Sequence, residues 1–199
     1  MVLYLISQKE GHKMTLKELK RKTLVLIEEY NKDKKGLTDD IDIEAKFNDV
    51  ANQRIYEICR IKKIPKWVDV DVKKGEIITL EDIERLVGYT VFQVSVIGGV
   101  EYEARANETV FRILEDGTAK IDVFVYPEAI NDKTGDSFEL ELTADVLEIL
   151  PYGIAGDLLS TDVSTEYGKL YRTMYEGMLG RLDPRTHMPA ITIVGGYNI

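Results

Sequence analysis

Apolar residues recur at helical spacing in the first part of the chain, after a capping signal at residues 15–18. In this Thr-Leu-Lys-Glu segment, the Thr and Glu side chains can each bond a free backbone N–H group at the start of a helix. Val25 points away from the apolar face, among charged residues. Most such residues are simply exposed, and the alternative is that Val25 contacts a partner. The apolar face of this predicted helix consists of Leu16, Leu19, Leu26, Ile27 and Tyr30.

A second helix is predicted after Asp40 and extends to about Lys63. Its apolar positions are Ile43, Phe47, Val50, Ala51, Ile58 and Ile61. Arg54 lies in the middle of this arc, and a buried guanidinium is costly unless a carboxylate pairs with it. We favour the interpretation in which the stem of Arg54 packs and its head reaches solvent, so that Arg54→Ala costs under about 1 kcal/mol. The alternative is an ion pair, within the subunit or at an interface, which makes Arg54 a candidate partner-binding residue.

A β-rich region follows the second helix. Residues 67–72 alternate between apolar and polar side chains, which predicts an edge strand or an extended linker, and a short capped helix is expected at 79–87. The sequences Gly98-Gly99 and Asp116-Gly117 favour tight hairpin turns, because they tolerate positive φ. The strands that flank these turns are 91–97, 100–104, 109–114 and 119–126. A three- or four-stranded antiparallel sheet is the expected product.

Helical spacing returns at Thr143 and keeps one apolar face across Pro151. The members of this face are Leu147, Leu150, Ile154 and Leu158. Pro151 has no backbone N–H group, so we expect it to kink the helix or to begin a new one. The small residues Gly153, Ala155 and Gly156 would allow another helix to approach closely.

A further cap at residues 162–165 precedes a wide apolar stripe that is rich in tyrosine and methionine and predicts another helix. We expect this stripe to pack in the core, and we favour that use over a binding groove. Its members are Tyr167, Leu170, Tyr171, Met174, Tyr175, Met178 and Leu182.

Pro184 and Pro189 end this helix, and a β-prone run follows at residues 191–194. Such a run, if exposed, is an aggregation risk unless another strand covers it. We therefore expect residues 184–199 to form an extended arm that adds a strand to a neighbouring protein, the alternative being that the arm pairs with the sheet of its own subunit. The candidate partner contacts in the arm are Ile191, Ile193, Val194, Tyr197 and Ile199.

Together these patterns predict an α+β fold. Both ends of the chain form an antiparallel helical bundle, with an inserted small antiparallel β-domain and an extended C-terminal arm. The expected segments are an N-terminal leader at 1–13, the first part of the bundle at 14–64, the β-rich insertion at 65–142, the second part of the bundle at 143–183 and the arm at 184–199.

Composition narrows the classes of function. The 199 residues are 44% hydrophobic and 31% charged, as in an ordinary globular protein, and the formal net charge is −9. Residues 1–35 are basic overall, so the rest of the chain is still more acidic and would repel a phosphate backbone. The short apolar run at residues 2–6 resembles neither a signal peptide nor a membrane span, and the single cysteine predicts synthesis in a reducing cytoplasm.

No motif for phosphate binding, nucleophilic catalysis or zinc binding appears in the sequence. Cys59 lies at the margin of a helix face, where a small hydrophobic role is usual. An acidic cluster at the start of the second predicted helix is explained more simply by capping than by a metal site. Its members are Asp39, Asp40, Asp42 and Glu44. We expect no catalytic activity, no cofactor and no bound metal, and keep a metal-dependent hydrolase as the least favoured alternative.

Three segments of the chain have distinctive sequences: Val-Phe-Val-Tyr-Pro-Glu-Ala-Ile (123–130), Leu-Thr-Ala-Asp-Val-Leu-Glu-Ile-Leu-Pro-Tyr-Gly-Ile-Ala-Gly-Asp-Leu-Leu (142–159) and Tyr-Gly-Lys-Leu-Tyr-Arg-Thr-Met-Tyr-Glu (167–176). They resemble a known family, the head-to-tail adaptor, or head-completion, proteins of tailed bacteriophages. The order of elements over residues 15–199 agrees in outline with that family, and the last two segments are the more specific.

The resemblance implies a structural protein of the virion neck, made in the cytoplasm of a bacterial host. It implies a twelvefold ring that binds the portal protein, continues the DNA channel and receives a stopper or tail-completion protein. DNA would pass through this channel without sequence-specific binding, and no membrane would be involved. The family has no catalytic residues to carry over. Our second hypothesis is a soluble protein-binding module that works as a monomer or dimer outside the virion.

Overall fold

The computed structural model describes residues 13–28, 41–105, 109–159 and 166–182. These residues form five helices and eight strands, and each strand pairing between them is antiparallel. The mixed α+β class expected from the sequence is confirmed. The predicted arm and the predicted leader, apart from Lys13, lie outside the described residues, as does Tyr30.

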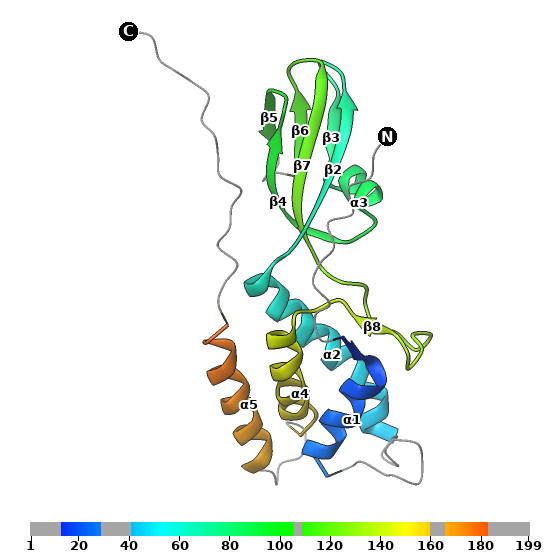
Figure 1. Ribbon diagram of the computed structural model, residues 1–199, viewed down its shortest axis with the longest axis vertical. Coiled ribbons are helices and arrows are strands. Elements are labelled where there is room, and N and C mark those ends of the chain that lie inside the picture. The colour runs from blue at the N-terminus through cyan, green and yellow to red at the C-terminus, as the bar shows by residue number, and fades with distance from the viewer. Residues whose placement is uncertain (1–12, 29–40, 106–108, 160–165, 183–199) are drawn as a thin grey trace. The chain divides into compact units, whose positions relative to one another are not determined.

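Contacts between the described residues divide the chain into two units (Figure 1). The helical unit contains the described residues up to Arg60 together with Pro127–Leu182, and the β unit contains Ile61–Tyr126. The β-rich insertion expected from the sequence, 65–142, extends beyond this unit. The insertion is shorter than expected, because the segment that follows Tyr126 packs with the helices.

Two sets of hydrogen bonds hold the segment after Tyr126 in the helical unit. The short strand β8 (Glu139–Leu140) pairs with β1 (Met14–Thr15). In addition, the side chain of Asn52 donates to the carbonyl oxygen of Ile130 at 2.8 Å and accepts from the Ile130 N–H group at 2.9 Å. The side-chain amide of Asn52 thus bonds the backbone of Ile130 in the way that a neighbouring strand would. Because this contact depends on one side chain, no periodic pattern in the sequence indicates it.

The first two helices match the sequence pattern closely. Helix α1 (Leu16–Leu26) begins at the expected capping box, in which the Thr15 hydroxyl accepts from the Glu18 N–H group at 3.2 Å and the Thr15 N–H group donates to the Glu18 carboxylate at 2.9 Å. Helix α2 (Ile41–Lys62) ends one residue before the expected Lys63. Its buried residues are Phe47, Ala51, Ile55, Ile58 and Cys59.

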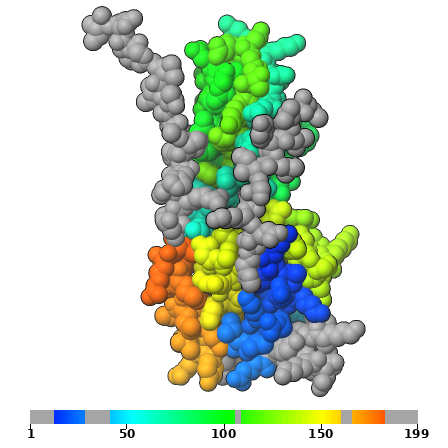
Figure 2. Space-filling view, viewed as in Figure 1, coloured from blue at the N-terminus to red at the C-terminus, as the bar shows by residue number. Residues whose placement is uncertain are grey.

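Helix α4 (Ala144–Leu158) is the central helix of the helical unit. It packs against α1 and against α5 (Glu166–Leu179) and lies between them (Figure 1 and Figure 2). Its buried residues occur on all its sides, as expected for a helix that other helices surround. The helix runs unbroken through Pro151, so the proline does not begin a new helix. No helix in the described part of the chain is long and apolar enough to cross a membrane.

The β unit contains two three-stranded antiparallel sheets. One sheet has the order β2-β7-β4, formed by Ile64–Val72, Gly117–Val125 and Val91–Gly98. The other has the order β3-β6-β5, formed by Ile77–Thr79, Val110–Ile113 and Tyr102–Arg105. Strand β2 is an edge strand, which was one of the two expected possibilities. The short helix α3 (Leu80–Val87) begins at a capping box and ends at Val87, as predicted, with Gly88 as its C-cap.

The two predicted glycine turns are not hairpin turns. Strand β4 pairs with β7 rather than β5, and β6 pairs with β3 and β5 rather than β7. Between the sheets the pairing continues, since Leu114 donates to the Glu101 carbonyl at 2.8 Å and Ile113 donates to the Glu76 carbonyl at 2.9 Å. Three long strands therefore bend together, β2 into β3, β4 into β5 and β6 into β7. In place of the expected single sheet, a three-stranded ribbon bends across its middle and so forms the two sheets.

The folded ribbon encloses one core and requires glycine where its backbones meet. Core members from both sheets and α3 include Val72, Ile78, Ile83, Phe111, Ile113, Ile121 and Val123. At the bend, Gly99 has a φ of 84°, and a Cβ atom there would overlap the carbonyl oxygen of Thr118. A Cβ atom on Gly117 would lie 2.9 Å from Cγ1 of Val100. The Gly-rich sequences that suggest tight turns thus serve the close approach of two chain segments.

We predict that Gly99→Ala destabilises the β unit far more than Gly75→Ala. Both glycines have positive φ and share the backbone strain of about 1–2 kcal/mol, but a Cβ atom on Gly75 meets nothing within 4 Å. The overlap with the Thr118 carbonyl adds about 1–3 kcal/mol for Gly99→Ala alone. The loss of stability in each variant is measured by thermal denaturation followed by circular dichroism. Equal losses of stability would contradict the close approach at the bend.

Candidate functional site

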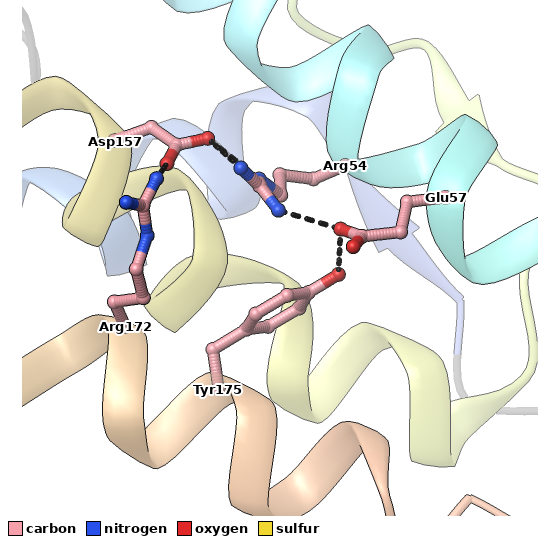
Figure 3. A network of polar contacts seen from close by, with 5 residues as sticks. All are labelled: Arg54, Glu57, Asp157, Arg172 and Tyr175. Carbon is pink, nitrogen blue, oxygen red and sulfur yellow. Dashed lines mark hydrogen bonds and ion pairs between the residues drawn. The ribbon is translucent and has the colours of Figure 1, made fainter.

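The carboxylate of Asp157 connects three helices of the helical unit. It lies near the end of the largely apolar α4, with a side chain that is 11% exposed. The Nε atom of Arg54, on α2, donates to Asp157 at 2.6 Å, and Nη2 of Arg172, on α5, donates to its other oxygen at 2.7 Å (Figure 3). Charge-assisted bonds of this kind are the stronger hydrogen bonds in proteins.

The network continues on the other side of Arg54. Its Nη1 atom donates to Glu57 at 2.6 Å, and the hydroxyl group of Tyr175 donates to the same carboxylate oxygen at 2.7 Å (Figure 3). The guanidinium also lies over the Tyr175 ring, 5.4 Å from its centroid. Five side chains from α2, α4 and α5 thus form one connected polar network, and Arg54 is at its centre.

Two glycines of α4 allow α5 to come close enough for this network. A Cβ atom on Gly153 would lie 2.8 Å from the Tyr175 ring, and one on Gly156 would lie 3.0 Å from the backbone nitrogen of Arg172. The sequence prediction of a close helix approach at these small residues is confirmed. Without that approach, Tyr175 and Arg172 could not reach the polar groups of α2 and α4.

The favoured interpretation of Arg54 is wrong, and the alternative of an ion pair within the subunit is correct. The Arg54 side chain is only 13% exposed, and its head is paired with two carboxylates of its own unit. These pairs account for the position of Arg54 without any contact to a partner. A signal was present in the sequence, because Asp157 is one of few charged residues in the α4 segment and a buried arginine needs such a partner.

The surroundings of Arg54 and Tyr175 raise the pKa of each. Burial by itself lowers the pKa of Arg54, but hydrogen bonds and charge interactions with Asp157 and Glu57 outweigh it, and the pKa is raised above the ordinary value. Burial raises the pKa of Tyr175, and its hydrogen bond to Glu57 raises it further. At neutral pH, Arg54 is therefore charged and Tyr175 is neutral, so Arg54 can pair with carboxylates and Tyr175 can donate a hydrogen bond.

Cys59 lies on the buried face of α2 and is 1% exposed. Burial raises the pKa of its thiol to about 12. The thiolate, which is the nucleophilic form, is therefore rare at neutral pH. This placement agrees with the small hydrophobic role expected from the sequence.

The tyrosine- and methionine-rich stripe of α5 has a buried edge and an exposed edge. Tyr175 is 2% exposed, as the expected core role requires. In contrast, Tyr167, Leu170 and Met174 are 65%, 51% and 40% exposed, so the core role is wrong for this edge. Among the described elements, α5 packs against α4, which leaves this part of the apolar arc exposed. We call these three residues the α5 edge.

The remaining sequence candidates have different outcomes. Val25 on α1 is 51% exposed and points outward as expected. The arm residues Ile191, Ile193, Val194, Tyr197 and Ile199 lie outside the described residues. Of the acidic cluster, Asp42 and Glu44 are in the first turn of α2. Among the described side chains, no group of three or more His, Cys, Asp or Glu residues is placed to hold a metal ion.

Comparisons with known proteins give no assignment. No protein-family model matches the sequence, and no curated protein is similar to it.

We predict that Arg54→Ala lowers the free energy of unfolding by about 3 kcal/mol, because it leaves Glu57 and the little-exposed Asp157 without their shared cation. The melting temperature should fall by roughly 6–12 °C for a chain of this size. Arg172→Ala is the matched control, since it removes the other arginine from Asp157 but its side chain is 51% exposed, and we expect it to cost under about 1 kcal/mol. Similar small losses for both variants would show that Arg54 contributes no more than a surface residue.

We predict that the stability difference between the wild type and Tyr175→Phe depends on pH. Below the unfolded pKa of about 10, the bond to Glu57 should contribute about 1 kcal/mol. Because the folded pKa of Tyr175 is raised, this contribution is lost as pH increases above about 10. Denaturant unfolding at pH 7 to 11 measures it, and Tyr167→Phe, at an exposed position, is the control. A difference that stays constant to pH 11 would contradict the raised pKa.

Proposed function

We propose that this chain is a structural subunit of a bacteriophage neck, an adaptor that forms a ring between the portal and the tail and continues the DNA channel. The observation that carries the proposal is the α5 edge. It is an exposed apolar face on one of the two segments, 142–159 and 167–176, that most specifically resemble the adaptor family. Exposed apolar faces of this kind are typical of surfaces that another protein covers.

The packing around α5 supports an assembly role. Tyr167, Leu170 and Met174 follow one another at helical spacing, so they form a continuous stripe for a partner. The polar network holds the opposite side of α5 against α2 and α4, so the stripe is presented on a fixed support. Full burial of one such side chain contributes about 1.5–3 kcal/mol, and a ring repeats that contribution at each of its contacts.

The charge of the chain supports a role beside DNA without binding it. The formal net charge is −9, and an acidic channel wall would let a duplex slide without sticking. In this proposal the four long helices make an antiparallel bundle in the body of the ring. Residues 184–199 act as an arm that adds a strand to a neighbour, with contacts from Ile191, Ile193, Val194, Tyr197 and Ile199.

We predict that Leu170→Glu combined with Met174→Glu prevents assembly and leaves the fold intact, because it puts charge into an apolar contact that only the assembled state buries. Negative-stain microscopy of the wild type with its portal protein should show rings with rotational symmetry around a channel, and the double variant should show none at an unchanged melting temperature. Lys169→Gln, on the polar side of α5, is the control and should still assemble.

Two outcomes would contradict the proposal. One is a wild type that forms no symmetric ring, either alone or with the portal. The other is phage particles in which an antibody against the chain labels no site where the head meets the tail. A monomer or dimer that binds a protein outside the virion would instead favour the soluble binding module.

A further inference from the structure

We propose that a second copy of this chain docks the outward side of its helix α1 on the outer face of strand β2, with Val25 against Trp67, Arg21 against Asp69 and Lys17 against Asp71. This contact rests on the proposed function, because it names surfaces through which subunits of the ring would meet. It uses two different faces of the chain, so each copy can give one and receive the other.

The receiving face is the solvent side of β2. Alternate residues of this edge strand are exposed, among them Trp67, Asp69 and Asp71. Trp67 is 59% exposed and is the only tryptophan in the chain. Directly across from it on β7 is a further acidic residue, Asp122, and Lys120 faces Asp69. This face therefore begins with Trp67 and continues with Asp69 and Asp71, with a third carboxylate and one ammonium group beside them on β7. The Asp71 carboxylate also accepts from the Thr118 hydroxyl at 2.7 Å.

The docking face is the outward side of α1. Lys17, Arg21 and Val25 are all exposed and follow one another at intervals of four residues, so they form one row along the helix. Glu18 is beside this row, but its carboxylate is bound in the capping box with Thr15. The row therefore presents two cations and then one apolar side chain.

The two rows have matching lengths and order. Four helical residues rise about 6 Å, and two strand residues rise about 6.7 Å. A helix that runs opposite to β2 can thus place three successive side chains against three successive side chains of the strand. In that direction the apolar Val25 meets the apolar Trp67, and both cations meet carboxylates. The start of α1, where the helix dipole is positive, would also lie near Asp71.

Charge reversal tests the contact. We expect Arg21→Glu and Asp69→Lys each to weaken self-association about tenfold, measured by analytical ultracentrifugation at low salt. A mixture of the two variants should associate again, because each retains one native face and the two altered faces have opposite charge. Arg112→Glu, at an exposed position on β6, is the control and should associate like the wild type.

Disulfide trapping provides a second readout that works even for weak contacts. In the double variant Val25→Cys and Trp67→Cys, oxidation at high protein concentration should give a ladder of covalent oligomers, and each single variant should give dimers at most. Cys59 does not interfere, because it is 1% exposed.

The outcomes separate this contact from the proposed function. If microscopy shows rings but the charge variants assemble normally and no ladder forms, this contact is wrong and the ring stands. If neither rings nor a ladder form, both proposals fail. A ladder with no recovery of association in the mixed variants would overturn the pairing of Arg21 with Asp69.

Discussion

The carboxylate of Asp157 is the constraint on which the arrangement of the helices depends. A charge at a position that is 11% exposed in a largely apolar helix is costly unless it is paired. The two arginines that pair with Asp157 come from α2 and α5, and Arg54 lies more than a hundred residues before Asp157 in the sequence. The carboxylate is therefore fully paired only when Arg54 of α2 and Arg172 of α5 both reach α4. Gly153 and Gly156 are part of the same requirement, because any side chain there would push α5 away from the carboxylate.

This arrangement links the core of the helical unit to its surface. The stripe of α5 supplies Tyr175 to the network on one edge and exposes Tyr167, Leu170 and Met174 on the other. Helix α1 joins the same framework, because the Tyr171 hydroxyl donates to the Leu26 carbonyl at 2.6 Å. The exposed row of α1 and the exposed edge of α5 are thus fixed relative to each other by contacts within one unit. Surfaces held in this way lose little conformational entropy when a partner binds.

Local signals were predictable from the sequence, and contacts across the chain were less so. The capping boxes at Thr15 and Thr79 and the bounds of α2 followed from spacing and residue type, since these depend on neighbours in sequence. The Gly98-Gly99 and Asp116-Gly117 segments misled because the same residues serve a hairpin turn and a close backbone crossing. Arg54 misled because its pairing depends on Asp157, which periodicity within α2 cannot reveal. The exposed edge of α5 could not be predicted from periodicity, because exposure depends on which side of α5 packs against α4.

The pairing of β2 with β7 has a consequence for the origin of this architecture. The first residue of β2, Ile64, pairs with the last residue of β7, Val125, so the chain enters and leaves the β unit through two adjacent strand ends. A segment whose ends are neighbours can be gained or lost by a single genetic event without separating the helices on either side of it. The β unit is therefore an insertion with adjacent ends, and a short loop in its place would leave the connection between the flanking helical segments intact.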